Sequence, residues 1–212
     1  MVTGSELLAA VDAAFAVTGR GLARWPDPHG GRAPLDEEYA RLTNAGKWRI
    51  VGARADAWLA ALADARLATV ERDVEVRWTA APGPVISRTD RLVPRAAGAL
   101  PLVVARSRID DVGDAGVTLG VGDPAVCVAW IPPCGCDACD RGAQPEIDQL
   151  DDAVLPIVLG VFRRLSKGDR VVTVHGELGW SAANVPARAV PAILSRPRGW
   201  DELWGASWLG ER

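Results

Sequence analysis

The sequence of 212 residues is poor in histidine, phenylalanine, tyrosine and long apolar runs, and each shortage narrows what the protein can be. The longest nearly apolar run, residues 99–105, is far too short to cross a membrane. The first residues lack a positively charged start and include Glu6 and Asp12, so we expect no secretory signal peptide. We therefore predict a cytoplasmic protein with reduced cysteines and no membrane association.

Basic charge and the common catalytic motifs are also lacking. The net charge is −3 and the pI is near 5.5, so the chain offers no electrostatic footprint for a nucleic-acid partner. The two histidines are His29 and His175, and no G-x-S-x-G motif supplies a nucleophile for either of them. Gly120-Val-Gly122 lacks the third glycine and the following helix of a dinucleotide-binding loop, which favours a hairpin turn. These absences favour a protein that is not an enzyme.

Hydrophobic periodicity predicts helices at the start of the chain and strands after them. Helical spacing of apolar residues covers residues 6–17 and 47–68. A period of two then indicates strands, which we place at residues 74–78, 85–93, 100–109, 117–121 and 125–131. Further along, we expect a helix near residues 146–165, acidic at its start and basic at its end, and a hairpin of residues 170–175 and 179–182.

The order of these elements predicts an α+β fold. Helices followed by a meander of short strands differ from the alternating pattern that produces a parallel α/β sheet. We expect a mostly antiparallel sheet of about five to seven strands, packed by the N-terminal helices and by the helix near residues 146–165. A chain of this length suits a single domain, residues 1–212, with a helical part at about 1–68 and a sheet-rich part at about 69–212.

Tryptophan and arginine stand out among the residues that are present. Nine tryptophans occur against two phenylalanines and one tyrosine. Trp200, Trp204 and Trp208 are four residues apart, which predicts one face of a helix that docks on the sheet or forms a partner or dimer interface. A group of arginines on the predicted strands either pairs with acidic residues or forms an anion site, and its members are Arg88, Arg91, Arg95, Arg106 and Arg108.

The four cysteines fall within thirteen residues, and three of them form the motif Cys134-Gly-Cys136-Asp-Ala-Cys139. Residues i and i+2 of an extended segment point the same way, so the first two thiols can aim at one point while the third turns back. Three such sulfurs suit a tetrahedral zinc ion with Zn–S distances of about 2.3 Å. The predicted metal ligands are Cys134, Cys136, Cys139 and Cys127, with Asp137, Asp140, His175 or water as other candidates for the fourth position.

Other interpretations of the cysteine cluster stay open. The thiols form a local disulfide or redox pair, which a reducing compartment disfavours, or they stay reduced in a turn, with Cys127 as a small buried hydrophobic residue. An iron–sulfur cluster normally needs four thiolates at longer spacings. A bound zinc ion would pin a loop, whereas a catalytic zinc would also need an open coordination position and a base. Glu146 is the nearest glutamate in the sequence.

A combination of four stretches is distinctive: residues 25–29, residues 39–58, residues 122–126 and the C-G-C-D-A-C-D motif of residues 134–140. Together they resemble an uncharacterised actinobacterial protein family, a domain of unknown function, over most of the chain. The resemblance implies a soluble, single-domain bacterial protein. It also implies that the three-cysteine cluster belongs to the family pattern, whereas Cys127 is a feature of this chain. It brings no activity, substrate or catalytic residue.

The leading hypothesis is a non-enzymatic interaction or regulatory module, a monomer or weak dimer, with a protein partner. In it, the cysteine cluster binds a structural zinc ion and acts as a local staple. One alternative is a metal-dependent hydrolase that uses the cysteine cluster. The other is a thiol redox sensor in which Cys136 and Cys139 oxidise reversibly.

Overall fold

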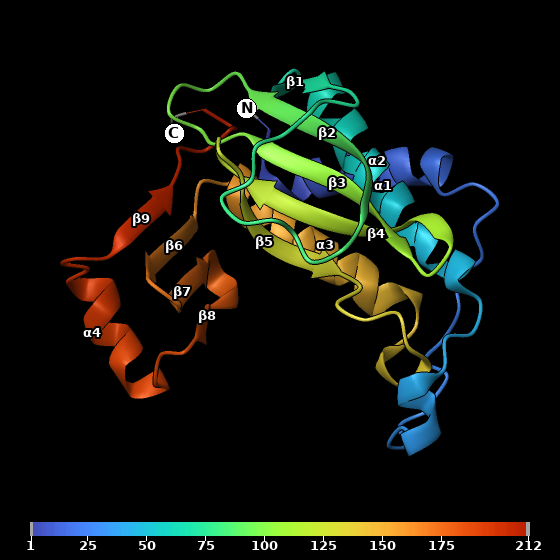
Figure 1. Ribbon diagram of the computed structural model, residues 1–212. Coiled ribbons are helices and arrows are strands. Elements are labelled where there is room, and N and C mark those ends of the chain that lie inside the picture. The colour runs from blue at the N-terminus through green and yellow to red at the C-terminus, as the bar shows by residue number, and fades with distance from the viewer. Residues whose placement is uncertain (1, 211–212) are drawn as a thin grey trace.

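Two helices open the chain and pack against each other. The computed structural model describes residues 2–210 (Figure 1). Helix α1 (Gly4–Thr18) begins at a capping box in which the Glu6 main-chain N–H donates to Thr3 Oγ1 and the Thr3 N–H donates to the Glu6 carboxylate. It packs on helix α2 (Arg49–Asp64) through an apolar stripe of Leu7, Val11 and Phe15.

A five-stranded antiparallel sheet follows the helices. Its strands lie in chain order, so each one is hydrogen-bonded to the next. Because apolar residues occupy the covered face of the central strands, for example Leu102 opposite Val121, this sheet forms one wall of the main core. The strands are β1 (Ala68–Glu71), β2 (Ile86–Pro94), β3 (Leu102–Ile109), β4 (Val112–Val121) and β5 (Val126–Ile131).

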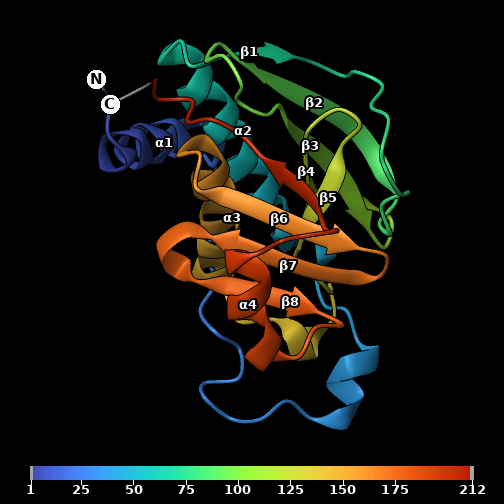
Figure 2. The same cartoon turned by 90° about the vertical axis from the view of Figure 1, so that its left-hand side faces the viewer.

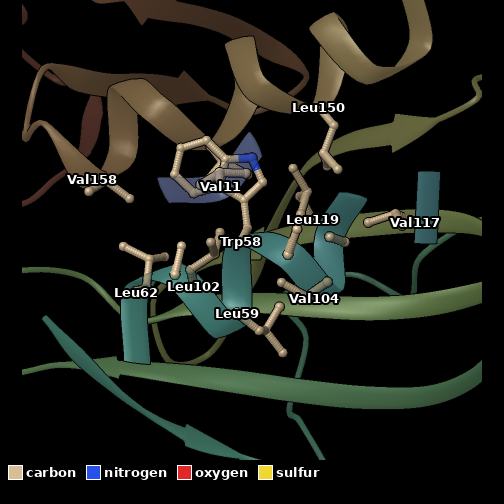
Figure 3. Packing of buried hydrophobic residues seen from close by; sticks show 14 of the residues in the cluster. Val11, Trp58, Leu59, Leu62, Leu102, Val104, Val117, Leu119, Leu150 and Val158 are labelled. Atoms are coloured by element: carbon tan, nitrogen blue, oxygen red, sulfur yellow. The ribbon is translucent and has the colours of Figure 1, made fainter. Parts of the chain in front are cut away.

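Helix α2 fills the space between the first sheet and helix α3 (Ala143–Val158). Figure 3 shows Leu59 directed toward the sheet, whereas Trp58 points toward α1 and α3. Both side chains are almost fully buried. Each contributes about 1.5–3 kcal/mol to stability through burial of apolar surface, so α2 is the centre of the core.

A second antiparallel sheet of four strands lies beside α3, in the order β8-β7-β6-β9 (Figure 2). Its outer face carries the short helix α4 (Val190–Ser195), which covers a small apolar cluster of Leu165, Val172 and Val190. The predicted α+β class is confirmed, and the strands are divided between two sheets. The strands of the second sheet are β6 (Phe162–Lys167), β7 (Arg170–His175), β8 (Trp180–Ala183) and β9 (Asp201–Trp204).

Two predicted helical stretches are corrected by the structure. The helix expected near residues 146–165 ends at Val158, because Gly160 adopts a φ of +70° and a Cβ there would lie 2.4 Å from Ser207 N. The residues that follow form β6 instead. The tryptophan helix is also wrong: Trp204 ends a strand paired with β6 and is 62% exposed, whereas Trp208 is buried.

The strand predicted at residues 74–78 belongs to neither sheet. In the described chain, Trp78 forms an isolated bridge to Ala125. Its indole covers Gly120 of β4, where a Cβ would lie 2.6 Å from Trp78 Cζ3. The alternating pattern therefore marks a segment that crosses the sheet. It is held by the packing of Trp78 and by a few main-chain hydrogen bonds, such as Val74 N to Thr89 O and Thr79 N to Ala125 O, instead of a continuous ladder.

A long segment between α1 and α2, residues 25–47, is here named the connector. It contains the short 3₁₀ helix η1 (Asp36–Ala40), and a second one, η2 (Ala45–Trp48), leads into α2. Figure 1 shows the connector in blue as an extension beyond the sheet that returns beside the chain after β5. Within residues 2–210, every helix is too short or too polar to pass through a bilayer.

Candidate metal centre

The three clustered cysteines follow directly on strand β5. Cys134 is exposed, whereas Cys136 and Cys139 are partly buried. The Cys134 and Cys136 sulfur atoms are 3.1 Å apart, and the three sulfur atoms all lie within 4.8 Å of one another. The short 3₁₀ helix η3 (Asp137–Cys139) turns the chain back, with Cys139 N donating to Cys136 O at 3.1 Å. The predicted convergence of three thiols is confirmed.

The spacing of these sulfurs suits a tetrahedral metal ion. Zn–S bonds of about 2.3 Å at tetrahedral angles place neighbouring sulfurs about 3.8 Å apart. That value lies between the 3.1 Å that separates the Cys134 and Cys136 sulfurs and the 4.8 Å limit of the group. Gly135 allows this segment to lie against Ile109 at the end of β3, because a Cβ there would lie 2.5 Å from Ile109 Cγ2. The cluster, hereafter the knuckle, is therefore close enough to hold a metal ion through three ligands.

Crowding also sets the ionisation of the knuckle. Burial raises the pKa of Cys136, but hydrogen bonds from Cys134 and Cys139 outweigh it and leave that pKa below its ordinary value. Burial and its hydrogen bond to Cys136 raise the pKa of Cys139 to about 12. The pKa values of Cys136 and Cys139 thus move in opposite directions, because negative charge on a neighbouring sulfur disfavours the Cys139 thiolate. A divalent cation among the sulfurs would relieve that repulsion.

The other predicted ligands lie elsewhere. Cys127 is a partly buried residue of β5 with its sulfur 4.0 Å from Ala129 O, and burial raises the pKa of its thiol. The group of three neighbouring sulfurs does not include it among residues 2–210. His175 lies on β7, where its Nε2 is 3.2 Å from Ser181 Oγ, and it lines a different pocket together with Asp152.

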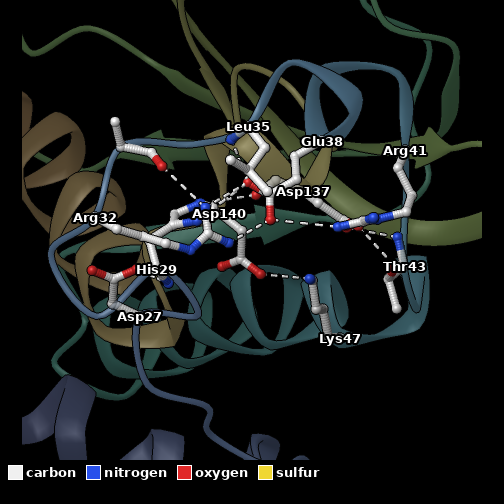
Figure 4. Close-up of polar contacts among 11 residues, drawn as sticks. Asp27, His29, Arg32, Leu35, Glu38, Arg41, Thr43, Lys47, Asp137 and Asp140 are labelled. Carbon is white, nitrogen blue, oxygen red and sulfur yellow. Dashed lines mark hydrogen bonds and ion pairs between the residues drawn. The ribbon is translucent and has the colours of Figure 1, made fainter.

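Asp137, inside the knuckle, is bound to the connector (Figure 4). Arg41 Nε donates to its carboxylate at 2.6 Å, and Thr43 donates from both its main-chain N and its Oγ1 at 2.7 Å. Burial raises the pKa of Asp137, but these hydrogen bonds outweigh it and lower the pKa to about 2. Its own N–H donates to Arg41 O at 2.8 Å, so the two segments are tied by main chain and side chain alike.

Asp140 makes a second tie and is 1% exposed. Lys47 Nζ pairs with its Oδ2 at 2.5 Å, while Trp25 Nε1 and Gly142 N donate to Oδ1 at 2.8 and 2.9 Å. The Lys47 ammonium also lies 5.7 Å from the Trp25 ring centroid and 5.1 Å from that of Trp48, which are cation–π distances. The charge of Asp140 is therefore compensated inside the protein.

Glu38 of η1 is the third buried carboxylate of this region. It forms a bidentate pair with Arg32 at 2.5 and 2.9 Å and accepts from Leu35 N at 2.7 Å. The hydrogen bonds from Arg32 are the main reason that its pKa is lowered to about 2. His29 lies between Glu38 and the knuckle: its Nε2 is 3.1 Å from Asp137 O and its Nδ1 is 3.8 Å from the Glu38 carboxylate.

Sequence reasoning treated Asp137 and Asp140 as candidate ligands and overlooked the connector as their partner. Three of the stretches that carried the family resemblance meet here: residues 25–29, residues 39–58 and the knuckle motif. The sequence did offer one indication that the connector binds the aspartates: Lys47 is one of only two lysines in the chain and lies in one of those stretches.

Comparison with known proteins assigns most of the chain to one family. No curated protein and no solved structure matches the chain. A family model described as a family of unknown function matches residues 11–208, which include the connector and the knuckle. The protein therefore belongs to DUF6226, a family of unknown function.

Proposed function

We propose that this protein is a non-enzymatic interaction or regulatory module whose knuckle binds one structural zinc ion. One observation carries the proposal. Three thiols converge within 4.8 Å, while both aspartates of the same motif hold the connector. Metal and connector are thus bound by alternating residues of a single short turn, so an ion that fixes the turn also fixes the connector.

In this proposal, the fourth zinc ligand would be a water molecule. Cys134 is exposed, which leaves access for water in the isolated protein. Asp137 and Asp140 are poorly placed to fill this position, because their oxygens already accept hydrogen bonds from Arg41, Thr43 and Lys47. If Asp137 or Asp140 gave up these hydrogen bonds to bind zinc, the connector would be released from the knuckle.

Exposed tryptophans support a protein partner. Trp180 and Trp204 lie on the two edge strands of the second sheet and are 43% and 62% exposed. The register places them in one row, through Val174 and Arg163 of the central strands, so both side chains belong to the same face. Large exposed aromatic side chains around an arginine are typical of interaction surfaces.

A metal-dependent hydrolase is less well supported by the geometry. It would need a base near the open zinc position. The carboxylates of Asp137 and Asp140 are engaged with the connector. Glu146 is buried, and Arg141 Nη2 donates to one of its oxygens at 2.9 Å. Burial raises the pKa of Glu146, and among the described residues its carboxylate does not belong to the group of ligand atoms around the three sulfurs.

A thiol sensor is favoured by one specific distance. The sulfurs of Cys134 and Cys136 are 3.1 Å apart, so this pair is a candidate for disulfide formation in addition to the pair of Cys136 and Cys139. Oxidation by hydrogen peroxide would join the two sulfurs, and the two thiol protons and two electrons would pass to the peroxide, which becomes two water molecules. The zinc-bound form would resist this reaction, because the metal holds both thiolates.

The deciding experiment is the zinc content of protein purified without a metal-binding tag. We expect one equivalent per chain in the wild type and in Cys127→Ser, and none in Cys136→Ser. Limited proteolysis should then cleave the connector faster in Cys136→Ser, because residues 25–47 lose their fixed partner. A wild type without metal, in which Cys134 and Cys136 are oxidised by peroxide and restored by a reductant, would contradict the zinc site and support the redox sensor. Equal zinc loss in Cys127→Ser would make Cys127 the fourth ligand.

A further inference from the structure

A pocket of about 540 Å³ lies on the helix-covered side of the first sheet, away from the knuckle. The end of α1, the first turns of α2 and the strands β2–β4 surround it, and Arg106 of β3 is among the residues that line it. The covered face of β3 is apolar at Leu102 and Val104, so an arginine at the next inward position is unexpected. A charged side chain there needs a specific reason.

The bonding of Arg106 is incomplete. Its side chain is fully buried, and Nη2 donates to Asp56 Oδ1 at 2.5 Å. Within residues 2–210, its Nε and Nη1 are buried without any hydrogen-bond partner. A guanidinium carries five N–H donors in a planar fork that matches an oxyanion. Two of its three nitrogens are thus left for an acceptor that the chain does not supply.

Helix α2 packs closely over the Arg106 guanidinium at Gly52. Gly52 lines the pocket, and a Cβ at that position would lie 3.1 Å from Asp114 O and 3.9 Å from Arg106 Nε. The missing side chain therefore lets the backbone of α2 approach Asp114 O closely beside the Arg106 guanidinium.

The charge of the pocket wall is positive. Arg20, Arg49, Arg88 and Arg106 line it, against Asp56 and Asp114, which is an excess of two positive charges. Arg88 is compensated by Asp114 and by the buried Asp90, each at 3.2 Å. At the exposed rim, Arg49 donates to Gly113 O at 3.3 Å, and in the described chain neither Arg49 nor Arg20 has a carboxylate within 4.0 Å.

We propose that this pocket binds the phosphoryl group of a small phosphorylated molecule. A phosphate monoester carries close to two negative charges at neutral pH, which matches the excess of the wall. Its oxygens would accept hydrogen bonds from Nε and Nη1 of Arg106, which have no partner among the described residues, and Arg20 and Arg49 at the rim would hold the outer side. The volume suits a metabolite-sized ligand, since small-molecule sites span about 300–1,000 Å³. This site is independent of the knuckle and goes beyond the proposed function.

Calorimetric titration with inorganic phosphate, against chloride at equal ionic strength, tests the proposal on the full chain. We expect saturable binding to the wild type, and a loss of roughly tenfold or more in affinity when both rim arginines are removed in R20A/R49A. The matched control is R188A/R196A, which removes two exposed arginines outside the pocket and should bind like the wild type. Cys136→Ser should also bind normally.

Arg106→Met should abolish binding, and the rim variant decides the question if Arg106→Met does not fold. An NMR spectrum of arginine Nε–H groups adds a direct readout, since the buried Arg106 signal should move on phosphate addition and be missing in Arg106→Met. Equal weakening in R188A/R196A and R20A/R49A would show non-specific attraction and overturn the site. So would a wild type that does not bind phosphate.

Discussion

Removing the negative charge of Asp137 is expected to release the connector without unfolding the core. In Asp137→Asn, Thr43 N still finds an oxygen, but the new amide N–H₂ faces Arg41 Nε. A hydrogen bond to a charged group is worth about 1.5–3 kcal/mol. Arg41 is 53% exposed and can turn to solvent, which recovers part of that amount. We therefore expect the free energy of unfolding of Asp137→Asn to be lower by about 1–2 kcal/mol.

Asp137→Ala should cost more, about 3 kcal/mol. It removes all three hydrogen bonds to the carboxylate and leaves Thr43 N without a partner at a partly buried position. The control is Asp36→Asn in η1, an exposed aspartate without an ion pair in the described chain, for which we expect less than about 0.5 kcal/mol.

Urea unfolding at constant m-value, together with proteolysis of residues 25–47, measures both effects. The asparagine variant should be cut faster in the connector while the helices α1 and α2 stay protected. If Asp137→Asn and Asp36→Asn are equally stable and equally resistant, the knuckle does not hold the connector and the reasoning fails.

Two further predictions concern charge inside the fold. Asp151→Ala should destabilise the protein by about 3–5 kcal/mol in urea unfolding, because buried Arg54 loses its bidentate partner and Trp58 Nε1 loses its acceptor. Asp12→Ala removes the other, 70% exposed partner of Arg54 and should cost less than about 1 kcal/mol; equal losses would contradict the assignment. Lowering the pH should reduce stability between about pH 4 and pH 2, since the folded-state pKa values of Glu38 and Asp137 are near 2, below their ordinary values, and protonation favours the unfolded chain. The free energy of unfolding of Asp137→Asn should fall less steeply with decreasing pH in that window. An unchanged slope would show that the hydrogen bonds to Asp137 do not lower its pKa.

The sequence was sufficient where one local pattern decided the structure. The helix predicted at residues 6–17, the strand at 100–109 and the hairpin around 176–179 agree with α1, β3 and the β7–β8 pair, because each pattern buries one face or forms one tight turn. The knuckle was predictable for the same reason, since its three thiols are neighbours along the chain.

Prediction failed where distant residues decide. Trp200, Trp204 and Trp208 fit a helix by spacing, but pairing of β9 with β6 overrides that preference. The end of α3 is set by the approach of residues 206–207 to Gly160, which no local pattern records. In the candidate site, Asp137 and Asp140 were predicted only as candidate metal ligands, and their partners in the structure lie about 90 or more residues earlier in the chain.

The separation between the connector and the knuckle also fixes an order of events during synthesis. Hydrogen bonds join Trp25 to Asp140 across 115 residues and Thr43 to Asp137 across 94 residues. The chain leaves the ribosome from its N-terminus, so residues 25–47 emerge long before any of their partners. Helices α1 and α2 can pair early, but the connector between them has nothing to bind until about two-thirds of the protein has been made. Docking of the connector is therefore one of the late steps in the folding of the newly synthesised chain.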